Sequence, residues 1–138
     1  MKIDIFNIKK YLRTPGDATL ARVGHVNAAV NAAARPYKVY TALLSQTGTN
    51  APVATILENT LGVVPTYSYG GAGEYKVIHT DGFTLNKTVV FMNTALNSQT
   101  ASILIDYQSN DAIHISTFDT TPQNDILFNT SIEIRVYN

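Results

Sequence analysis

The sequence contains no cysteine, and only 14% of its residues are charged. The lack of cysteine excludes disulfide frameworks, zinc sites with cysteine ligands and cysteine nucleophiles. No stretch approaches the roughly 18 consecutive apolar residues of a membrane-spanning helix. Residues 1–12 are interrupted by lysine and aspartate, so they lack the apolar core of a secretory signal peptide. We therefore expect a protein that has no membrane partner and is not exported through a cleaved signal.

The low charge is itself informative about the class of protein. Soluble globular proteins carry about a quarter charged residues, and this chain falls well below that share. A hydrophobic content of 45% nevertheless indicates a folded chain. At 138 residues the chain has room for one domain with an appended element, which needs no metal or disulfide to fold. This composition favours a protein that packs among copies of itself or among partners.

The net charge of zero hides an asymmetry between two parts of the chain. Residues 1–35 hold six basic and two acidic residues, whereas residues 36–138 hold four basic and eight acidic residues. A basic arm joined to an acidic body favours docking on a negatively charged partner, although ordinary solvation of a terminal segment is the alternative. Six dispersed cations are a weak signature of nucleic-acid binding, so no specific nucleic acid is predicted as a partner.

Residues 18–34 are predicted to form an α-helix within the arm. The N-cap is either Thr14, with Pro15 at the first helical position, or Asp17 three residues later, and the helix must end before Pro36. Apolar residues and one asparagine recur at spacings of three and four, which is a short heptad seam. The helix is expected to pack on its own body, on identical helices or on a larger partner. The expected oligomerisation or anchoring residues are Leu20, Val23, Asn27, Val30 and Ala34.

After Pro36 the hydrophobic period changes from 3.6 to 2, which indicates strands. The first strand is nearly all apolar and is expected to be covered on both faces. A glycine-rich hairpin tip at Gly70–Gly73, turns at Asp81-Gly82 and Ser109–Asp111, and a loop at Asp119–Asn124 separate later strands. The expected strands are Tyr37–Ser45, Val53–Asn59, Val63–Tyr69, Glu74–Thr80, Thr88–Met92, Ser102–Gln108, Ala112–Thr117 and a last one that includes Ile132–Val136.

These patterns predict a mostly β protein in two parts. Residues 1–35 form the basic arm with its helix, and residues 36–138 form an antiparallel β-sandwich or jelly-roll-like body of about eight strands. The order of the strands within the sheets does not follow from the sequence.

No motif in the sequence carries catalytic chemistry. There is no G-x-S-x-G turn for a nucleophilic serine, and the acidic residues show no preferred pairing. A metal site composed of His79, Asp81 and His114 lacks a second short-spaced pair of ligands. We therefore predict no catalytic, cofactor or metal site and no enzymatic activity, with a hydrolase that uses His79 or His114 as a remote alternative.

Three tyrosines flank the glycine-rich tip and suggest a ligand patch. Tyr67, Tyr69 and Tyr75 could present aromatic faces at one end of the body, where they would stack on a sugar. The alternative is that they cap the hydrophobic core with their hydroxyl groups in water.

Two parts of the sequence resemble small structural proteins of tailed bacteriophages. These are Thr14-Pro15-Gly16 with Leu20–Asn27, and the opening of the body over Tyr37–Gly48 and Leu57–Gly62. The resemblance implies a component of the virion, such as a head fibre, a capsid decoration protein or a small tail protein. In such proteins the N-terminal arm anchors to capsid or tail proteins and a β domain projects outward, often as a homotrimer. No functional residue is carried over, because no motif defines one.

The function predicted from the sequence is therefore that of a non-enzymatic virion protein, attached through its arm and exposing a β domain. A carbohydrate-binding β-sandwich module that recognises a host glycan is the alternative, resting on the tyrosines near Gly70–Gly73.

Overall fold

The computed structural model describes residues 35–93 and 100–138, and the described residues from Tyr37 onward belong to one compact unit, here called the β body. The predicted helix and its heptad seam lie outside the described residues. The part that is described contains no helix that could cross a membrane. The strands are β1 (Tyr37–Ser45), β2 (Val53–Asn59), β3 (Thr66–Gly71), β4 (Glu74–Ile78), β5 (Thr88–Asn93), β6 (Ser102–Ser109), β7 (Ala112–Asp119), β8 (Thr121–Pro122) and β9 (Thr130–Tyr137).

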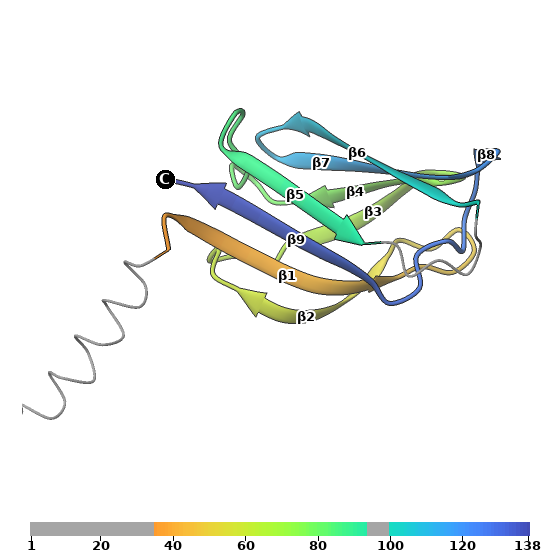
Figure 1. The fold of residues 1–138 in the computed structure, drawn as a ribbon, viewed down its shortest axis with the longest axis horizontal. Helices are drawn as coiled ribbons and strands as arrows, with labels where there is room; N and C mark the ends of the chain where they lie inside the picture. Colours follow the sequence, from red (N-terminus) through yellow and green to blue (C-terminus); the bar gives the residue numbers. More distant parts are fainter. Residues whose placement is uncertain (1–34, 94–99) are drawn as a thin grey trace, which may run out of the picture. The chain divides into compact units, whose positions relative to one another are not determined.

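The strands form two antiparallel sheets that lie one over the other (Figure 1). Sheet A has the order β2-β1-β9-β5, and sheet B has the order β3-β4-β7-β6 with the short β8 beside β7. This sandwich-like, all-β arrangement confirms the prediction of an antiparallel body with about eight strands. The two-residue β8 lies within the predicted loop Asp119–Asn124, where Phe118 pairs with Pro122.

The first and last strands of the β body lie side by side. β1 and β9 pair continuously from Tyr37 opposite Tyr137 to Leu44 opposite Thr130. β9 also pairs with β5, so the last strand is an interior strand of sheet A. Consecutive strands form the hairpins β1–β2, β3–β4 and β6–β7. The sheet can therefore form only when residues nearly a hundred positions apart meet.

The core lies between the two sheets and follows from the period of two along each strand. Ile103, Ile105 and Tyr107 of β6 are half-buried and pack against the core, whereas the residues between them are exposed, as predicted. Each fully buried aliphatic side chain contributes about 1.5–3 kcal/mol relative to an exposed one. The largest completely buried apolar side chains on the strands come from both sheets: Tyr40, Leu44, Ile132 and Ile134 from sheet A, and Tyr75, Val77, Ile113 and Ile115 from sheet B.

Two expected features of the strands differ in the structure. β3 begins at Thr66 rather than Val63, and Val63 and Val64 are exposed. Pro65 explains the later start, because proline has no N–H group to donate to a ladder. The prediction that β1 is covered on both faces is also wrong along much of its length, since Thr41 and Leu43 are only half-buried on the outward side.

The glycine-rich hairpin tip between β3 and β4 is confirmed, and it is tightly packed. Gly73 has a φ of 70°, in the left-handed region that favours glycine. A Cβ atom there would lie 2.3 Å from the carbonyl oxygen of Thr117, whose amide donates to the carbonyl of Gly73 at 2.8 Å. The close approach of the hairpin tip to β7 therefore requires glycine at this position.

Candidate binding site on the outer face of sheet A

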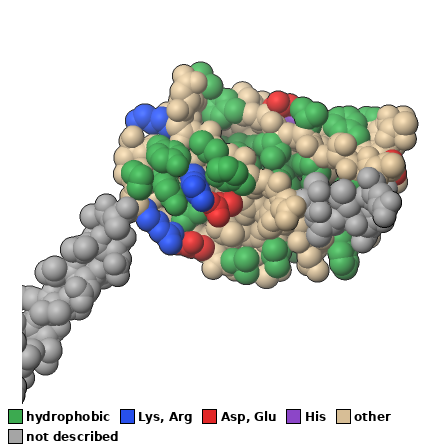
Figure 2. Space-filling view, viewed as in Figure 1, with side chains coloured by type: hydrophobic (Ala, Val, Ile, Leu, Met, Phe, Trp, Pro, Cys, Tyr) green, Lys and Arg blue, Asp and Glu red, His purple; other side chains and the backbone are tan. Residues whose placement is uncertain are grey.

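Four side chains on the outer face of sheet A form a continuous stack, here called the aromatic–arginine cluster: Tyr37, Phe91, Arg135 and Tyr137. The Cζ atom of Arg135 lies 4.9 Å from the ring centroid of Tyr37 and 5.0 Å from that of Phe91. The rings of Tyr37 and Tyr137 are 5.1 Å apart and tilted. Figure 2 shows hydrophobic side chains gathered beside basic and acidic ones on this face. The positive charge of Arg135 is attracted to the electron-rich faces of both rings.

The register of the strands builds the cluster. Tyr37 on β1 lies opposite Tyr137 on β9, and Arg135 on β9 lies opposite Val89 on β5. Residues opposite one another in antiparallel strands have Cβ atoms about 4.5–5.5 Å apart, and every second residue points to the same face. Three strands that are distant in the sequence thus supply one surface.

The cluster is ordered by its own contacts but remains open to solvent. Val39 beneath it is only 3% exposed, although it lies on the outward side of β1. Phe91 is 50% exposed, Val89 is 40% exposed and Tyr137 is 37% exposed. Contiguous exposed apolar surface rimmed by polar residues is typical of binding sites.

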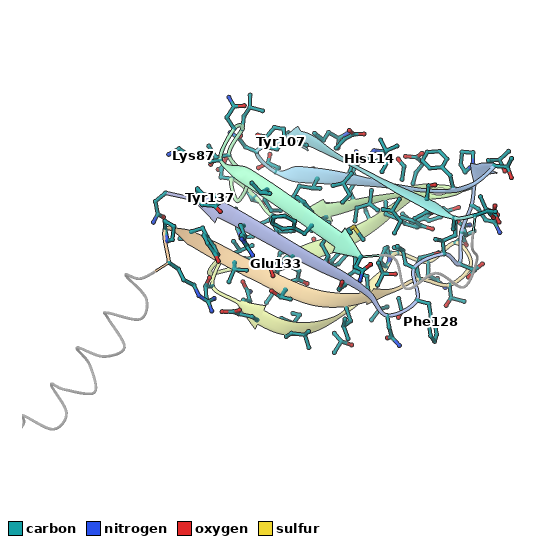
Figure 3. All side chains as sticks on the ribbon, viewed as in Figure 1. Lys87, Tyr107, His114, Phe128, Glu133 and Tyr137 are labelled. Carbon is teal, nitrogen blue, oxygen red and sulfur yellow. The ribbon has the colours of Figure 1, made fainter. Side chains whose placement is uncertain are left out.

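Glu133 fixes the arginine of the cluster. The Nε atom of Arg135 donates a hydrogen bond to the Oε1 atom of Glu133 at 2.5 Å. This hydrogen bond is the main reason why the pKa of Arg135 is raised above its already high usual value. The guanidinium group therefore stays charged and holds the Glu133 carboxylate in one orientation. Glu133 and Tyr137 both lie on β9 (Figure 3).

A small pocket of about 230 Å³ opens beside Phe91 on the same face. Its centre is a row across three strands, in which Glu133 lies between Thr41 and Phe91. The exposed ring of Phe91 is thus bordered by the Glu133 carboxylate, the Asn93 carboxamide and the hydroxyl groups of Thr41 and Ser131. The lining residues are Thr41, Phe91, Met92, Asn93, Ser131, Ile132 and Glu133.

The three tyrosines of the predicted ligand patch lie together, but on the inner side of sheet B. Tyr75 is completely buried, and Tyr67 and Tyr69 are half-buried against the core. The hydroxyl groups of Tyr67 and Tyr40 are 3.1 Å apart, and the rings of Tyr69 and Tyr75 are 6.0 Å apart. An exposed patch made by all three rings is therefore absent from this structure, because the ring of Tyr75 is completely buried.

The inner tyrosines take part in a polar network that holds the loops at one end of the β body. The hydroxyl group of Tyr75 donates to Gln46 Oε1 at 2.9 Å and lies 3.2 Å from Asn124 Oδ1. Asn124 Oδ1 also accepts a hydrogen bond from the backbone amide of Gly73 at 2.9 Å. The Nδ2 atom of Asn124 lies 3.3 Å from the Tyr69 hydroxyl. Burial raises the pKa of Tyr75, so its hydroxyl group keeps its proton for the network.

The outer face of sheet B carries a serine, a histidine and a glutamate in contact. His114 pairs with Glu74, and the Ser116 hydroxyl donates to Glu74 Oε2 at 3.3 Å and lies 3.5 Å from His114 Nδ1. Nucleophilic hydrolysis needs a serine aimed at its base and backbone N–H groups for an oxyanion. Ser116 instead faces the carboxylate from the interior strand β7, where neighbouring strands occupy the backbone on both sides. This arrangement has the geometry of a small hydrogen-bonded cluster on the sheet face.

The two histidines considered for a metal site are not brought together. His79 is buried on the inner side, with its ring 5.8 Å from that of Phe83. His114 lies on the outer side of sheet B, opposite Lys76. A composite site of His79, Asp81 and His114 is therefore wrong, and no group of three potential metal ligands occurs within the described ranges.

Comparison with known proteins identifies no relative of this chain. No protein-family model, curated protein or solved structure matches it. The expected anchoring residues Leu20, Val23, Asn27, Val30 and Ala34 lie outside the described residues. The aromatic–arginine cluster was not predicted, because its members come from three strands whose order the sequence does not reveal.

Proposed function

We propose that this chain is a non-enzymatic structural component of a tailed-bacteriophage particle, attached through residues 1–35 and exposing its β body. The observation that carries the proposal is the change at Pro36. The charge of the chain changes from +4 to −4 there, as six basic and two acidic residues give way to four basic and eight acidic ones. The resemblance of residues 14–62 to phage structural proteins supports the same assignment.

The architecture of the β body supports a separable arm. β1 begins at Tyr37, and its residues Tyr37–Leu44 pair with β9, so the strand pairing seen among the described residues starts at Tyr37. Partners for the arm would be capsid or tail proteins, and self-association as a trimer through the heptad seam is part of the proposal. The basic arm favours a negatively charged partner. Salt would therefore weaken the attachment, because it screens the attraction between the two charges.

The proposal is tested by incorporation of the chain into particles of the phage that encodes it. The full chain should co-sediment with purified particles, whereas a fragment of residues 36–138 should remain in the supernatant. A full-length variant with Lys9→Glu and Lys10→Glu should also lose most of its binding, because the basic character of the arm is reduced.

The matched control carries the same change of charge in the β body, as Lys76→Glu and Lys87→Glu. This control should co-sediment like the unaltered chain. Normal co-sedimentation of the fragment would show that the arm does not attach the protein. Absence of the full chain from particles would refute the structural assignment itself. The masses in solution of the full chain and of the fragment would show whether the arm makes a trimer.

A further inference from the structure

We propose that the pocket beside Phe91 binds a neutral carbohydrate, with the Phe91 ring as the stacking surface and Asn93 and Glu133 as hydrogen-bonding partners. This inference holds whether or not the chain is part of a virus particle. It places sugar recognition on the outer face of sheet A, on the opposite sheet from the tyrosines that the sequence suggested.

Phe91 is positioned to stack on a flat ligand. Its side chain is 50% exposed, and Arg135 holds one face of the ring at 5.0 Å. In the register of β5 and β9, Arg135 lies opposite Val89 and Ser131 lies opposite Asn93, on the two sides of the Phe91–Glu133 row. The pocket lies on the Asn93 side, so the ring separates the pocket from the guanidinium group. An immobilised ring loses little entropy when a sugar ring stacks on it.

The polar groups of the pocket match the hydroxyl groups of a sugar. A sugar hydroxyl both donates and accepts, and the lining offers a carboxylate acceptor, a carboxamide that does both, and the hydroxyl groups of Thr41 and Ser131. Glu133 is held by Arg135, so its carboxylate is preorganised before a ligand arrives. Few precisely placed polar groups beside an apolar wall are typical of small-ligand sites.

Charge and size narrow the class of sugar. Glu133 is the charged residue that lines the pocket, so a uronic or sialic acid would bring two carboxylates together. A volume of about 230 Å³ is below the roughly 300–1,000 Å³ of sites for drug-sized ligands. One neutral sugar unit fits this description, and further units would lie along the open sheet face.

The test is a titration of the full-length chain, followed by amide chemical shifts in solution. The probes are neutral hexasaccharides of α-linked glucose, β-linked glucose, β-linked N-acetylglucosamine and β-linked xylose, with an oligogalacturonate as the acidic comparison. At least one neutral probe should shift the amides of Asn93, Ser131 and Glu133 in a saturable way. The acidic probe should bind more weakly than the neutral one.

Substitutions then assign the site. Phe91→Leu keeps an apolar side chain on β5 but removes the aromatic face, and it should weaken binding about tenfold or more. Asn93→Ala should weaken binding to a smaller extent, because it removes hydrogen bonds only. Phe128→Ala is the matched control, since Phe128 is a 55% exposed phenylalanine that does not line the pocket, and it should bind normally.

Several results would overturn the inference. Absence of shifts with every neutral probe at millimolar concentration would do so, as would unchanged binding by Phe91→Leu. The exposed face also suits contact with a second copy of the chain. If Phe91→Leu lowers the mass of the protein in solution and leaves the titration unchanged, the face is an interface between copies and the carbohydrate site is wrong.

Discussion

Two groups of aromatic side chains in the β body have opposite roles, although they are interleaved in the sequence. Tyr37 and Tyr40 are three positions apart on β1, yet Tyr37 joins the outer aromatic–arginine cluster and Tyr40 is completely buried. Inside, the tyrosine hydroxyls contact one another and the loops; outside, the rings contact a guanidinium group. The inner group consists of Tyr40, Tyr67, Tyr69 and Tyr75, and the outer group of Tyr37, Phe91 and Tyr137.

The difference shows that strand parity, rather than residue type, assigns each aromatic side chain its role. An inward ring adds its full apolar area to the core, which contributes to stability. An outward ring keeps much of its area in water, so it contributes little to stability and remains available for a ligand. Substitutions in the two groups should therefore differ in which property they change.

The largest expected difference is between Tyr75→Ala and Tyr137→Ala. Tyr75 is completely buried and anchors the loop network, so its loss should lower the free energy of unfolding by about 3–5 kcal/mol. Tyr137 is 37% exposed, and its loss should cost about 1 kcal/mol or less. Urea unfolding of both variants measures the two values. Similar losses would mean that burial does not separate the two groups.

The next effect concerns the hairpin tip that packs against the inner tyrosines. Gly73→Ala should destabilise the β body by about 3 kcal/mol, because its Cβ would meet the Thr117 carbonyl and its φ is unfavourable for alanine. Gly71→Ala is the matched control, since a Cβ at Gly71 meets nothing within 4 Å. Thermal unfolding distinguishes them, and a stable Gly73→Ala variant would contradict the tight packing of the tip.

The smallest effect is a dependence of stability on alkaline pH, which we expect from Tyr67 of the inner group. Burial, together with the hydrogen bond to Tyr40, raises the pKa of Tyr67 above 10.0. The unfolded chain loses this proton above about pH 10 while the folded chain retains it, so stability is constant below that pH and falls above it. Each such group contributes a slope of up to about 1.4 kcal/mol per pH unit.

Tyr67→Phe should therefore make the decline of stability above pH 10 less steep. At neutral pH it should lower the free energy of unfolding by about 1 kcal/mol, because the hydrogen bond between the Tyr67 and Tyr40 hydroxyl groups is lost. Urea unfolding between pH 8 and pH 11 measures both, and equal slopes in Tyr67→Phe and the unaltered chain would refute the assignment.

Much of the fold could be predicted from local patterns. The bounds of β1 and β2 are the predicted ones, and β6 shows the predicted alternation of buried and exposed residues. The period of two in hydrophobicity is a property of each strand's own sequence, and turn residues such as Asn110 mark where a strand ends. Strands and turns can therefore both be predicted from the sequence. The start of β3 was misplaced, because the valines before Pro65 have strand propensity but lie outside the β3–β4 ladder, which begins at Thr66.

The candidate site could not be predicted in the same way. Phe91 reads as one apolar residue of a short strand, and Arg135 reads as a solvated residue of the last strand. Nothing in the sequence places β5 beside β9 and β9 beside β1, which is what brings Phe91, Arg135 and Tyr37 together. The tyrosines near Gly70–Gly73 were selected because they are close in sequence, which is no guide to the face that they occupy.

Local sequence patterns account for the β character of the body, most of its strands and turns, and the change of charge at Pro36, because periodicity, turn chemistry and charge are local properties. Which strands lie side by side, and therefore which side chains gather on each face, depends on the tertiary structure. Pairing of β1 with β9 and stacking of sheet A on sheet B buried Tyr75 and left Phe91 in solvent. Long-range strand pairing depends on the packing of the whole chain, and no single segment encodes it.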